Sequence, residues 1–331
     1  MLEEIGEREI IKILFEKYEK MPKMPIPFGD DVSAIEIDEE RLGILKTDML
    51  VAKTDVPKGM KIWQAARKAV VMNVSDFAAK GVKPKVMLVS LGLPRKLSKK
   101  DIIEEIGYGL NVAAREYDIY IVGGDTNEAC DLIIACMLFG IAEKNKVLTR
   151  SGAKLGDYVA VTGFFGNPPA GLKILVEKNI AVDEDLKNRL VSSVLMPKAR
   201  LKEGLALVKT GAVTASIDSS DGLAWSLHEI SAASKVGFEI DTVPISSEAK
   251  KFAEMRNLDP FELCFYGGEE YELVLTVNPH LWLEAERAVA KLGGQLIKIG
   301  KVTEEKGIFL KLENGRTVYL EPRGWEHFKS P

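Results

Sequence analysis

Residues 119 to 126 join a run of strand-forming residues to two glycines and an acid: Ile119-Tyr120-Ile121-Val122-Gly123-Gly124-Asp125-Thr126. The pattern predicts a buried strand that ends in a turn without side chains at the two glycines. Such a turn lets backbone N–H groups approach a ligand, and it places Asp125 where a cation could be held. For this stretch alone, an ordinary Gly-Gly-Asp turn is the alternative.

Acidic residues also mark the ends of other predicted elements. Two aspartates occur in Asp218-Ser219-Ser220-Asp221-Gly222, between a predicted strand and a predicted helix, where one N-cap residue would suffice. Asp76 lies on an otherwise apolar helix predicted over residues 61–80, where an unpaired buried carboxylate would be costly. The marked positions are Asp30, Asp31, Asp48, Asp76, Asp125, Asp218, Asp221 and Glu269.

Hydrophobic periodicity and turn residues divide the chain into alternating helices and strands. Helices are predicted over residues 3–20, 61–80, 98–113, 170–178, 185–195, 198–210, 223–235 and 279–292. Strands are predicted over residues 32–37, 42–45, 85–91, 119–122, 132–142, 157–161, 214–217, 273–277, 296–299 and 308–312, with a hairpin turn at 313–315. This mixture indicates an α+β or mixed α/β fold. A loop-like stretch at 150–156 suggests two domains, 1–148 and 149–331.

Composition excludes several classes of protein. The 331 residues carry a net charge of −4, which argues against nonspecific nucleic-acid binding. No apolar stretch is long enough to cross a bilayer, and the acidic N-terminus lacks the features of a signal peptide, so no membrane partner is expected. Three cysteines without metal spacing fit reduced thiols in the cytoplasm, and three scattered histidines make a histidine-built zinc site a poor fit.

The acidic pattern itself indicates a chemistry. The sequence contains neither a G-x-x-x-x-G-K-[ST] phosphate loop nor a G-x-G-x-x-G motif, and it suggests no Ser-His-Asp arrangement. Many converging carboxylates would repel one another unless divalent cations bridge them. Magnesium held by carboxylates completes its shell with water and substrate phosphates, so the pattern predicts Mg-dependent phosphate chemistry. Purely structural aspartates at turns are the alternative.

Eight motifs give the chain a resemblance to a known family. They are Gly29-Asp30-Asp31, Thr47-Asp48, Asn73-Val74-Ser75-Asp76, Gly123-Gly124-Asp125-Thr126, Leu148-Thr149-Arg150-Ser151-Gly152-Ala153, Ile217-Asp218-Ser219-Ser220-Asp221-Gly222, Gly267-Gly268-Glu269-Glu270-Tyr271-Glu272-Leu273 and Gly324-Trp325-Glu326-His327-Phe328. In this order they cover nearly the whole chain. The chain resembles the thiamine-monophosphate kinases, within the aminoimidazole-ribonucleotide-synthetase-like superfamily.

The resemblance implies a two-domain fold: an N-terminal sheet domain that binds ATP and Mg²⁺ and forms a homodimer, and a C-terminal α/β domain. It implies direct transfer of the γ-phosphoryl group of ATP, the co-substrate, to thiamine monophosphate with several Mg²⁺ ions. The implied metal ligands are Asp31, Thr47, Asp48, Asp76, Asp125, Asp218 and Asp221, of which Asp48, Asp76, Asp125 and Asp218 form the catalytic set. The implied ATP contacts are Tyr108, Gly124, Asp125, Arg150 and Ser220. The implied substrate contacts are Asp55, Glu269 and Trp325.

Several positions depart from the family pattern, and two of them concern predicted contacts. Lys46 stands where a Ser or Thr is expected, so one metal contact is lost or is replaced by a lysine–phosphate contact. Asp55 stands where bacterial members carry a histidine that contacts the substrate.

Other functions within the same resemblance are weighed against the kinase. The hydrogenase-maturation branch uses a C-terminal cysteine and the selenophosphate branch an N-terminal one, whereas this chain ends Lys329-Ser330-Pro331 and its first cysteine is Cys130. An enzyme like aminoimidazole ribonucleotide synthetase stays open as an alternative. So does a non-catalytic regulator that binds a nucleotide or thiamine, because a fold does not fix a function.

Overall fold

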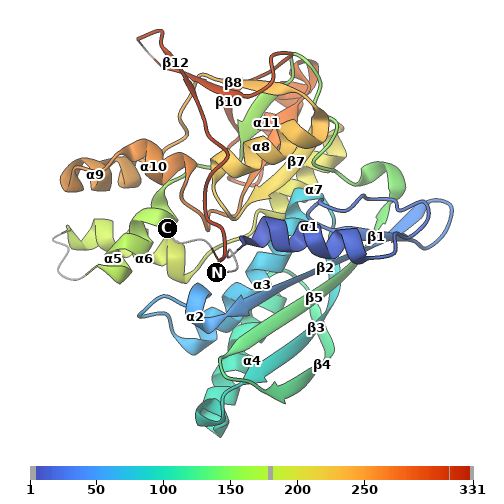
Figure 1. Cartoon of the computed structure of the whole chain (residues 1–331), viewed down its shortest axis with the longest axis vertical. Coiled ribbons are helices and arrows are strands. Elements are labelled where there is room, and N and C mark those ends of the chain that lie inside the picture. Colours follow the sequence, from blue (N-terminus) through green and yellow to red (C-terminus); the bar gives the residue numbers. More distant parts are fainter. Residues whose placement is uncertain (1–4, 178–181, 313, 329–331) are drawn as a thin grey trace.

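The computed structural model describes residues 5–177, 182–312 and 314–328. Two sheets form the molecule, with the N-terminal sheet at the bottom of Figure 1 and the C-terminal sheet at the top. The elements of the N-terminal half are α1 (Glu7–Lys17), β1 (Ser33–Glu36), β2 (Arg41–Val51), α2 (Ala52–Asp55), α3 (Ile62–Ala79), β3 (Pro84–Leu93), α4 (Lys100–Glu116), β4 (Tyr120–Glu128) and β5 (Ile133–Glu143). Their strands have the order β1-β2-β5-β3-β4, and only β3 and β4 pair in parallel.

The C-terminal half builds a larger sheet with the order β12-β11-β8-β10-β6-β9-β7. Its elements are β6 (Tyr158–Val161), α5 (Asn167–Val176), α6 (Glu184–Leu195), α7 (Leu201–Thr210), β7 (Val213–Ser219), α8 (Leu223–Ser234), β8 (Gly237–Ile240), α9 (Ser247–Arg256), α10 (Pro260–Phe265), β9 (Glu272–Val277), α11 (Trp282–Ala290), β10 (Ile297–Thr303), β11 (Ile308–Lys311) and β12 (Thr317–Tyr319). The expected mixed α/β fold is confirmed. The predicted hairpin turn includes residue 313, which lies outside the described residues.

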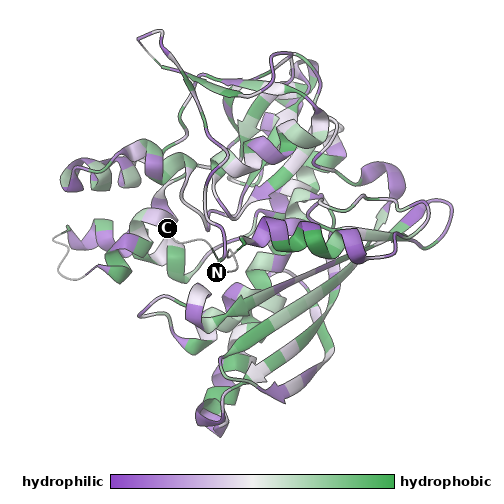
Figure 2. Cartoon of the chain, in the orientation of Figure 1, coloured by the Kyte–Doolittle hydropathy of each residue, from purple (hydrophilic) through white to green (hydrophobic). Residues whose placement is uncertain are grey.

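Helix α3 is the element that joins the two halves. It packs against β2 and β5 of the first sheet and against α7, β7 and β9 of the second. The largest buried cluster accordingly contains Val70 and Phe77 of α3 together with Leu207, Val213 and Leu275. Figure 2 shows apolar colour along the strands of the N-terminal sheet and alternating polar colour on the outer helices α1 and α9. The proposed division between residues 148 and 149 therefore crosses one continuous core and stays a prediction.

The helix predicted over 61–80 is confirmed by α3. Its last residue is Ala79, Lys80 is the C-cap, and Gly81 adopts a left-handed φ of +64°. A Cβ at Gly81 would lie 2.6 Å from the Cβ of Val208, so both the backbone and the packing call for glycine. The helix predicted from Ser98 begins instead at Lys100, with Lys99 as an N-cap that makes no side-chain bond.

The prediction of a buried strand that ends at a Gly-Gly turn is wrong. Strand β4 continues through Gly123, Gly124 and Asp125 to Glu128, and all its residues are exposed. The glycines do not end the strand because β3 pairs with it throughout, and a Cβ at Gly124 would lie 1.8 Å from the carbonyl oxygen of Val89. At the edge of the sheet, β4 has no neighbour beyond it among the described residues.

Strand β2 is also longer than its predicted range of 42–45. It pairs with β5 from Arg41 to Val51, so Asp48 lies within a strand and not at its end.

Short elements that carry little periodicity were not predicted, among them β8, α9 and α10. Helix α5 begins at Asn167 because Pro168 and Pro169 stand in a first turn, where proline is tolerated. In the part of the chain that the structure describes, no helix is long and apolar enough to cross a membrane.

Candidate active site

A cluster of three buried carboxylates lies where the two halves meet. Asp31 precedes β1, Asp76 belongs to α3 and Asp218 belongs to β7. Each offers one oxygen atom, and these three atoms lie within 4.8 Å of one another. We call Asp31, Asp76 and Asp218 the acidic cluster. Residues 45 and 142 positions apart in sequence thus converge because α3 carries Asp76 to the end of β7.

Two lysines, of which Lys80 is buried and Lys46 is partly exposed, neutralise part of this charge. Lys46 of β2 places its Nζ atom 3.0 Å from Asp48 and 3.1 Å from Asp76. Lys80, fully buried at the end of α3, lies 2.5 Å from Asp30 and 2.7 Å from Asp31. Lys80 Nζ also donates a hydrogen bond of 3.0 Å to the carbonyl oxygen of Ser216, which ties α3 to β7.

Arg150 closes the side of the acidic cluster at Asp31. Its Nε donates to Asp31 Oδ1 at 2.7 Å and its Nη1 donates to the carbonyl oxygen of Gly29 at 2.7 Å. Nη1 also lies 3.2 Å from Glu229, which in turn pairs with Arg8 of α1. Arg150, the predicted ATP contact, therefore pairs with two acids of the protein.

The pKa values in the acidic cluster reflect burial and mutual repulsion. Burial, followed by the charge of Asp31, raises the pKa of Asp218 to about 7, although Ser75 donates a hydrogen bond of 2.6 Å to it. Burial also raises the pKa of Asp76 well above its ordinary value, despite the opposing effect of Lys46. Burial acts in the same direction on Asp31, but Lys80 and Arg150 outweigh it and lower its pKa.

These residues fit a divalent cation such as Mg²⁺. The donor set consists of carboxylate oxygens, which hard cations prefer, and a bound cation would oppose the burial that raises the pKa values of Asp76 and Asp218. Asp31, Asp76 and Asp218 are the residues best placed to hold such an ion.

The structure brings some further predicted residues near the acidic cluster. Asp48 joins it through Lys46, and its backbone N–H donates to Asn73 Oδ1 at 2.8 Å. Thr47 is exposed on the opposite face of β2, because successive side chains of a strand alternate. Asp221, three residues after Asp218, lies 3.8 Å from Arg8 and accepts a hydrogen bond from Ser220 Oγ at 3.3 Å.

Three predicted ATP-site residues lie elsewhere in the chain. Gly124 and Asp125 are on β4, and the strands β5 and β3 lie between β4 and β2. At about 4.8 Å per strand spacing, β4 is roughly 14 Å from β2. Tyr108 is an exposed residue of α4 whose ring meets that of Trp63 at 5.8 Å. No interaction described for these residues reaches the acidic cluster.

The predicted substrate residues Asp55 and Glu269 are linked by a lysine that sequence reasoning missed. Lys68 of α3 is 1% exposed, and its Nζ lies 2.5 Å from Glu269 and 2.9 Å from the carbonyl oxygen of Asp55. The Asp55 carboxylate accepts from the backbone N–H of Val51 at 2.7 Å. Glu269 itself has a left-handed φ of +70°, which costs energy for a residue with a side chain.

Trp325, on the C-terminal tail, lies beside Asp221. Its backbone N–H donates to the carbonyl oxygen of Asp221 at 3.0 Å, and a Cβ at Gly324 would lie 2.1 Å from that same oxygen. The tail is therefore fixed by its backbone, while the Trp325 ring is 48% exposed and lies across from the ring of His327.

Sequence reasoning also missed Lys80, Arg8 and Glu229. The local sign of such residues is a charged side chain within an apolar stripe, as at Lys68 on α3 and at Lys80, its C-cap. That signal shows that a partner is needed but not which residue supplies it.

The fold and the acidic cluster together define a class of protein. Residues 29–142 match the family described as AIR synthase related protein, N-terminal domain, and residues 156–313 match its C-terminal domain, so the chain belongs to the AIR synthase related proteins. Relatives narrow this further. The chain is 38% identical over 328 residues to the thiamine-monophosphate kinase of Nitrosopumilus maritimus, covering 99% of this chain and 100% of that one.

The thiamine-monophosphate kinase of Pyrococcus abyssi is 36% identical over 330 residues, covering 99% of this chain and 97% of its own length. A solved structure described as AaThiL complexed with AMPPCP and TMP superposes with a TM-score of 0.84 at 30% identity and covers 97% of each chain. The chain belongs to the thiamine-monophosphate kinase family.

Proposed function

We propose that this protein transfers the γ-phosphoryl group of ATP to thiamine monophosphate and forms thiamine diphosphate. The observation that carries the proposal is the acidic cluster at the junction of both halves, in a chain that matches thiamine-monophosphate kinases over nearly its full length. Phosphoryl transfer asks chiefly for positioning and charge neutralisation, and this site supplies both without a covalent nucleophile.

Asp31, Asp76 and Asp218 would hold Mg²⁺, with Asp48 beside them. When bound, Mg²⁺ supplies positive charge against the phosphate oxygens. Lys46 is already paired with Asp48 and Asp76, so this chain provides a fixed ammonium group where the family pattern has a hydroxyl. Arg150 presents a planar guanidinium that can bind a phosphate with two parallel hydrogen bonds once it leaves Asp31.

The substrate end of the site is formed by Asp55, Glu269 and Trp325. Lys68 holds Glu269 in place, and the exposed Trp325 ring is free to stack on the cationic thiazolium of thiamine. These roles follow the family resemblance, and the position of Lys68 between Asp55 and Glu269 supports them.

We further propose that two copies of the chain form a homodimer through the N-terminal sheets. The edge strand β4 exposes the large side chains of Tyr120 and Val122, at 71% and 58%, and leaves one row of backbone groups unpaired within the described chain. A partner at this edge would cover them, and it would also change the surroundings of Gly124 and Asp125. The free thiols Cys130, Cys136 and Cys264 support the expected reducing cytoplasmic compartment.

The test is incubation of the protein with ATP, MgCl₂ and thiamine monophosphate, followed by chromatography. We expect thiamine diphosphate and ADP in equal amounts, and loss of nearly all turnover in Asp76→Asn. Asp241→Asn changes an exposed aspartate outside the site and should retain full activity. Nucleotide binding without any thiamine diphosphate would instead favour the regulator, and turnover of an aminoimidazole-ribonucleotide precursor would favour the other branch of the superfamily.

A further inference from the structure

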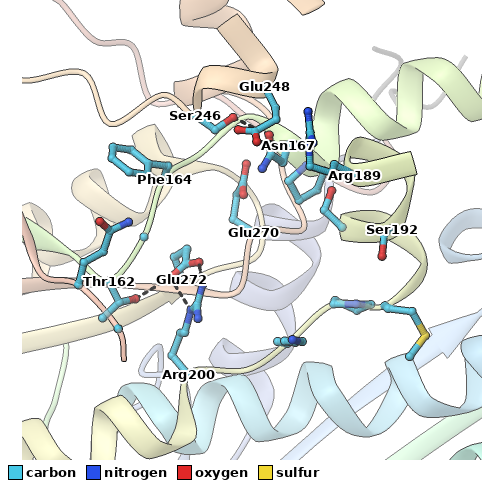
Figure 3. Close-up of a pocket in the computed structure, with 18 of the residues that line it drawn as sticks. Thr162, Phe164, Asn167, Arg189, Ser192, Arg200, Ser246, Glu248, Glu270 and Glu272 are labelled. Atoms are coloured by element: carbon cyan, nitrogen blue, oxygen red, sulfur yellow. Dashed lines mark hydrogen bonds and ion pairs between the residues drawn. The ribbon is translucent and has the colours of Figure 1, made fainter. Parts of the chain in front are cut away.

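A second cavity lies away from the acidic cluster. It has a volume of about 910 Å³ and is bounded by α6, by the start of α9, by the loop after β6 and by the start of β9 (Figure 3). None of the site residues predicted from the sequence lines it. The adjacent residues Glu269 and Glu270 divide the two regions, because Glu269 pairs with Lys68 whereas Glu270 faces the cavity.

Glu270 is the central polar group of this cavity (Figure 3). The residue is 9% exposed, and its Oε1 accepts a hydrogen bond from the backbone N–H of Gly166 at 2.5 Å. Its Oε2 has no partner among the described residues. Burial raises the pKa of Glu270 well above its ordinary value, which favours the neutral form of the carboxyl group. With Oε1 accepting from Gly166, Oε2 is the oxygen left to meet a ligand in the cavity, as an acceptor or, when the carboxyl group is protonated, as a donor.

One wall of the cavity is held rigid by a satisfied ion pair. The Glu272 carboxylate accepts from Thr162 Oγ1 at 2.7 Å and from Arg200 Nε at 2.7 Å, with a second contact to Arg200 Nη2. A Cβ at Gly163 would lie 2.5 Å from the Glu272 carboxylate, so a side chain there would displace this ion pair. This pair shapes the cavity, and it leaves Glu272 with little capacity to bind a ligand.

The polar groups left without a partner can mostly donate hydrogen bonds. Ser246 Oγ donates a hydrogen bond to the side-chain oxygen of Asn167. The amide nitrogen of Asn167 has no partner within the described chain. The side chains of Ser192 and Lys198 form no hydrogen bond or ion pair with a described residue, and the Arg189 side chain forms one ion pair among the described residues, at 3.5 Å to Glu248. Phe164, 47% exposed, adds an apolar ring surface on the side of the cavity opposite Arg189 (Figure 3). Such a lining favours an acceptor-rich anion that also has a flat ring.

We propose that this cavity is a second ligand site, distinct from the acidic cluster, for a phosphorylated heteroaromatic molecule the size of a nucleotide. Glu270 Oε2 and the Asn167 amide would form hydrogen bonds with the polar atoms of the ring, while Arg189 and Lys198 would neutralise the phosphate. An adenine nucleotide and a thiamine phosphate share this chemistry. The site does not depend on the proposed phosphoryl transfer, because its evidence is the cavity itself.

The test is isothermal titration calorimetry of the whole protein in EDTA, with ADP, thiamine diphosphate and inorganic pyrophosphate as three separate probes. Without Mg²⁺ the acidic cluster repels phosphates, so the cavity is the site expected to bind. We expect ADP or thiamine diphosphate to bind at one equivalent and more tightly than pyrophosphate, which has no ring. The probe that binds more tightly shows whether the site prefers an adenine nucleotide or a thiamine phosphate.

Variants decide where the probe binds. Arg189→Glu places a negative charge at the cavity and should weaken binding at least about tenfold. Lys187→Glu makes the same charge change on the same helix, outside the cavity lining, and should leave binding unchanged. Glu270→Gln keeps one acceptor and one donor and should retain binding, whereas Glu270→Leu should lose it.

The proposal is overturned if none of the probes binds saturably at millimolar concentration, or if Arg189→Glu and Lys187→Glu bind alike. Turnover is measured separately with Mg²⁺. If the enzyme is active but no probe binds in EDTA, only the second-site proposal is contradicted. If a probe binds as expected but the enzyme shows no turnover, only the kinase proposal is contradicted.

Discussion

Lys46, Lys80 and Arg150 pair with the aspartates in and beside the acidic cluster. Each places a positive group within 3.2 Å of an aspartate, so most of the negative charge is paired inside the protein. The pairing is incomplete, because Asp76 and Asp218 still have raised pKa values. The metal-free site therefore retains repulsion that a divalent cation would relieve.

Replacing Asp218 should affect stability in opposite ways with and without metal. Its pKa of about 7 exceeds the ordinary 3.8, so the folded protein holds a proton that the unfolded chain loses above about pH 4. The free energy of unfolding of the metal-free protein should therefore fall between about pH 4 and 7 and then level off. Asp218→Asn removes this loss and should stabilise the metal-free protein at pH 8 by up to about 4 kcal/mol.

The same variant should lose most of the rise in Tm that MgCl₂ gives to the wild type, because that rise requires cation binding to the folded state. Thermal melts at pH 5 and pH 8, with and without MgCl₂, measure both effects. A lower Tm for metal-free Asp218→Asn at pH 8 would contradict the assignment.

Arg150→Lys should raise the KM for ATP several-fold and the KM for thiamine monophosphate much less. A lysine cannot reproduce the planar two-pronged contact that Arg150 makes with Asp31 and the Gly29 carbonyl group. Steady-state kinetics with each substrate varied in turn measures the two constants. Equal changes in both would show that Arg150 supports the fold and not the nucleotide.

Trp325→Phe should keep much of the affinity for thiamine monophosphate, and Trp325→Ala should lose more of it. An indole face attracts the thiazolium cation by about 0.5–2 kcal/mol, and a smaller aromatic ring retains part of this attraction. Because the tail is fixed by backbone contacts, neither variant should change Tm by much. Substrate titration of the three proteins measures affinity, and ATP binding serves as the control. Equal affinities would leave Trp325 with no role in binding.

Among the elements, α3 depends on close approach by its neighbours. Helices α4 and α7 both pack against α3, with Gly109 of α4 near its first turn and Gly204 of α7 near its last. In both cases a glycine makes the contact, since a Cβ at Gly109 would lie 2.0 Å from the carbonyl oxygen of Trp63, and a Cβ at Gly204 would lie 2.0 Å from that of Ala78. The position of Asp76, Lys68 and Lys80 thus depends on two helices that approach α3 without side chains between them.

Two glycines of α4 should respond oppositely to alanine. Gly109→Ala places a methyl group against backbone and should lower the free energy of unfolding by about 1–3 kcal/mol. Gly107 has open space at its Cβ position, so Gly107→Ala should stabilise the helix by about 0.5–1 kcal/mol. Urea denaturation of the two variants measures both values. Similar effects of the two substitutions would mean that α4 does not approach α3 this closely.

For the whole molecule, the exposed edge of the N-terminal sheet is the feature that a second copy would cover. Residues of β4 are exposed on both faces, although β3 beside it has buried residues on one face. An edge strand with large apolar side chains is a surface that proteins usually protect.

Val122→Lys should therefore convert the proposed dimer to a monomer, because it places a charge on the edge that would pair. Val176 on α5 is exposed to a similar extent, at 67% against 58%, and Val176→Lys should leave the dimer intact. Light scattering coupled to size-exclusion chromatography measures the masses. A wild-type protein that elutes as a monomer at micromolar concentration would refute the dimer.

Much of the fold follows from local pattern in the sequence. The stripe of apolar residues that predicts a helix over 61–80 corresponds to α3, and the apolar runs at 132–142 and 273–277 correspond to β5 and β9. Periodicity depends on neighbours a few residues apart, so it is visible without a structure. The motifs around Asp31, Asp76 and Asp218 likewise indicate an acidic site, because residue types and spacing alone carry that signal.

Tertiary structure alone decides which side chains share a site. Nothing local to Lys80 shows that it pairs with Asp30 and Asp31, fifty residues earlier, and nothing local to Gly124 shows that it lies in an exposed edge strand. The cavity around Glu270 also exists only because α6, α9 and β9 meet there. Burial, pairing and pKa depend on atoms brought together by the path of the whole chain, and that path is set by packing over distances that local sequence pattern does not encode.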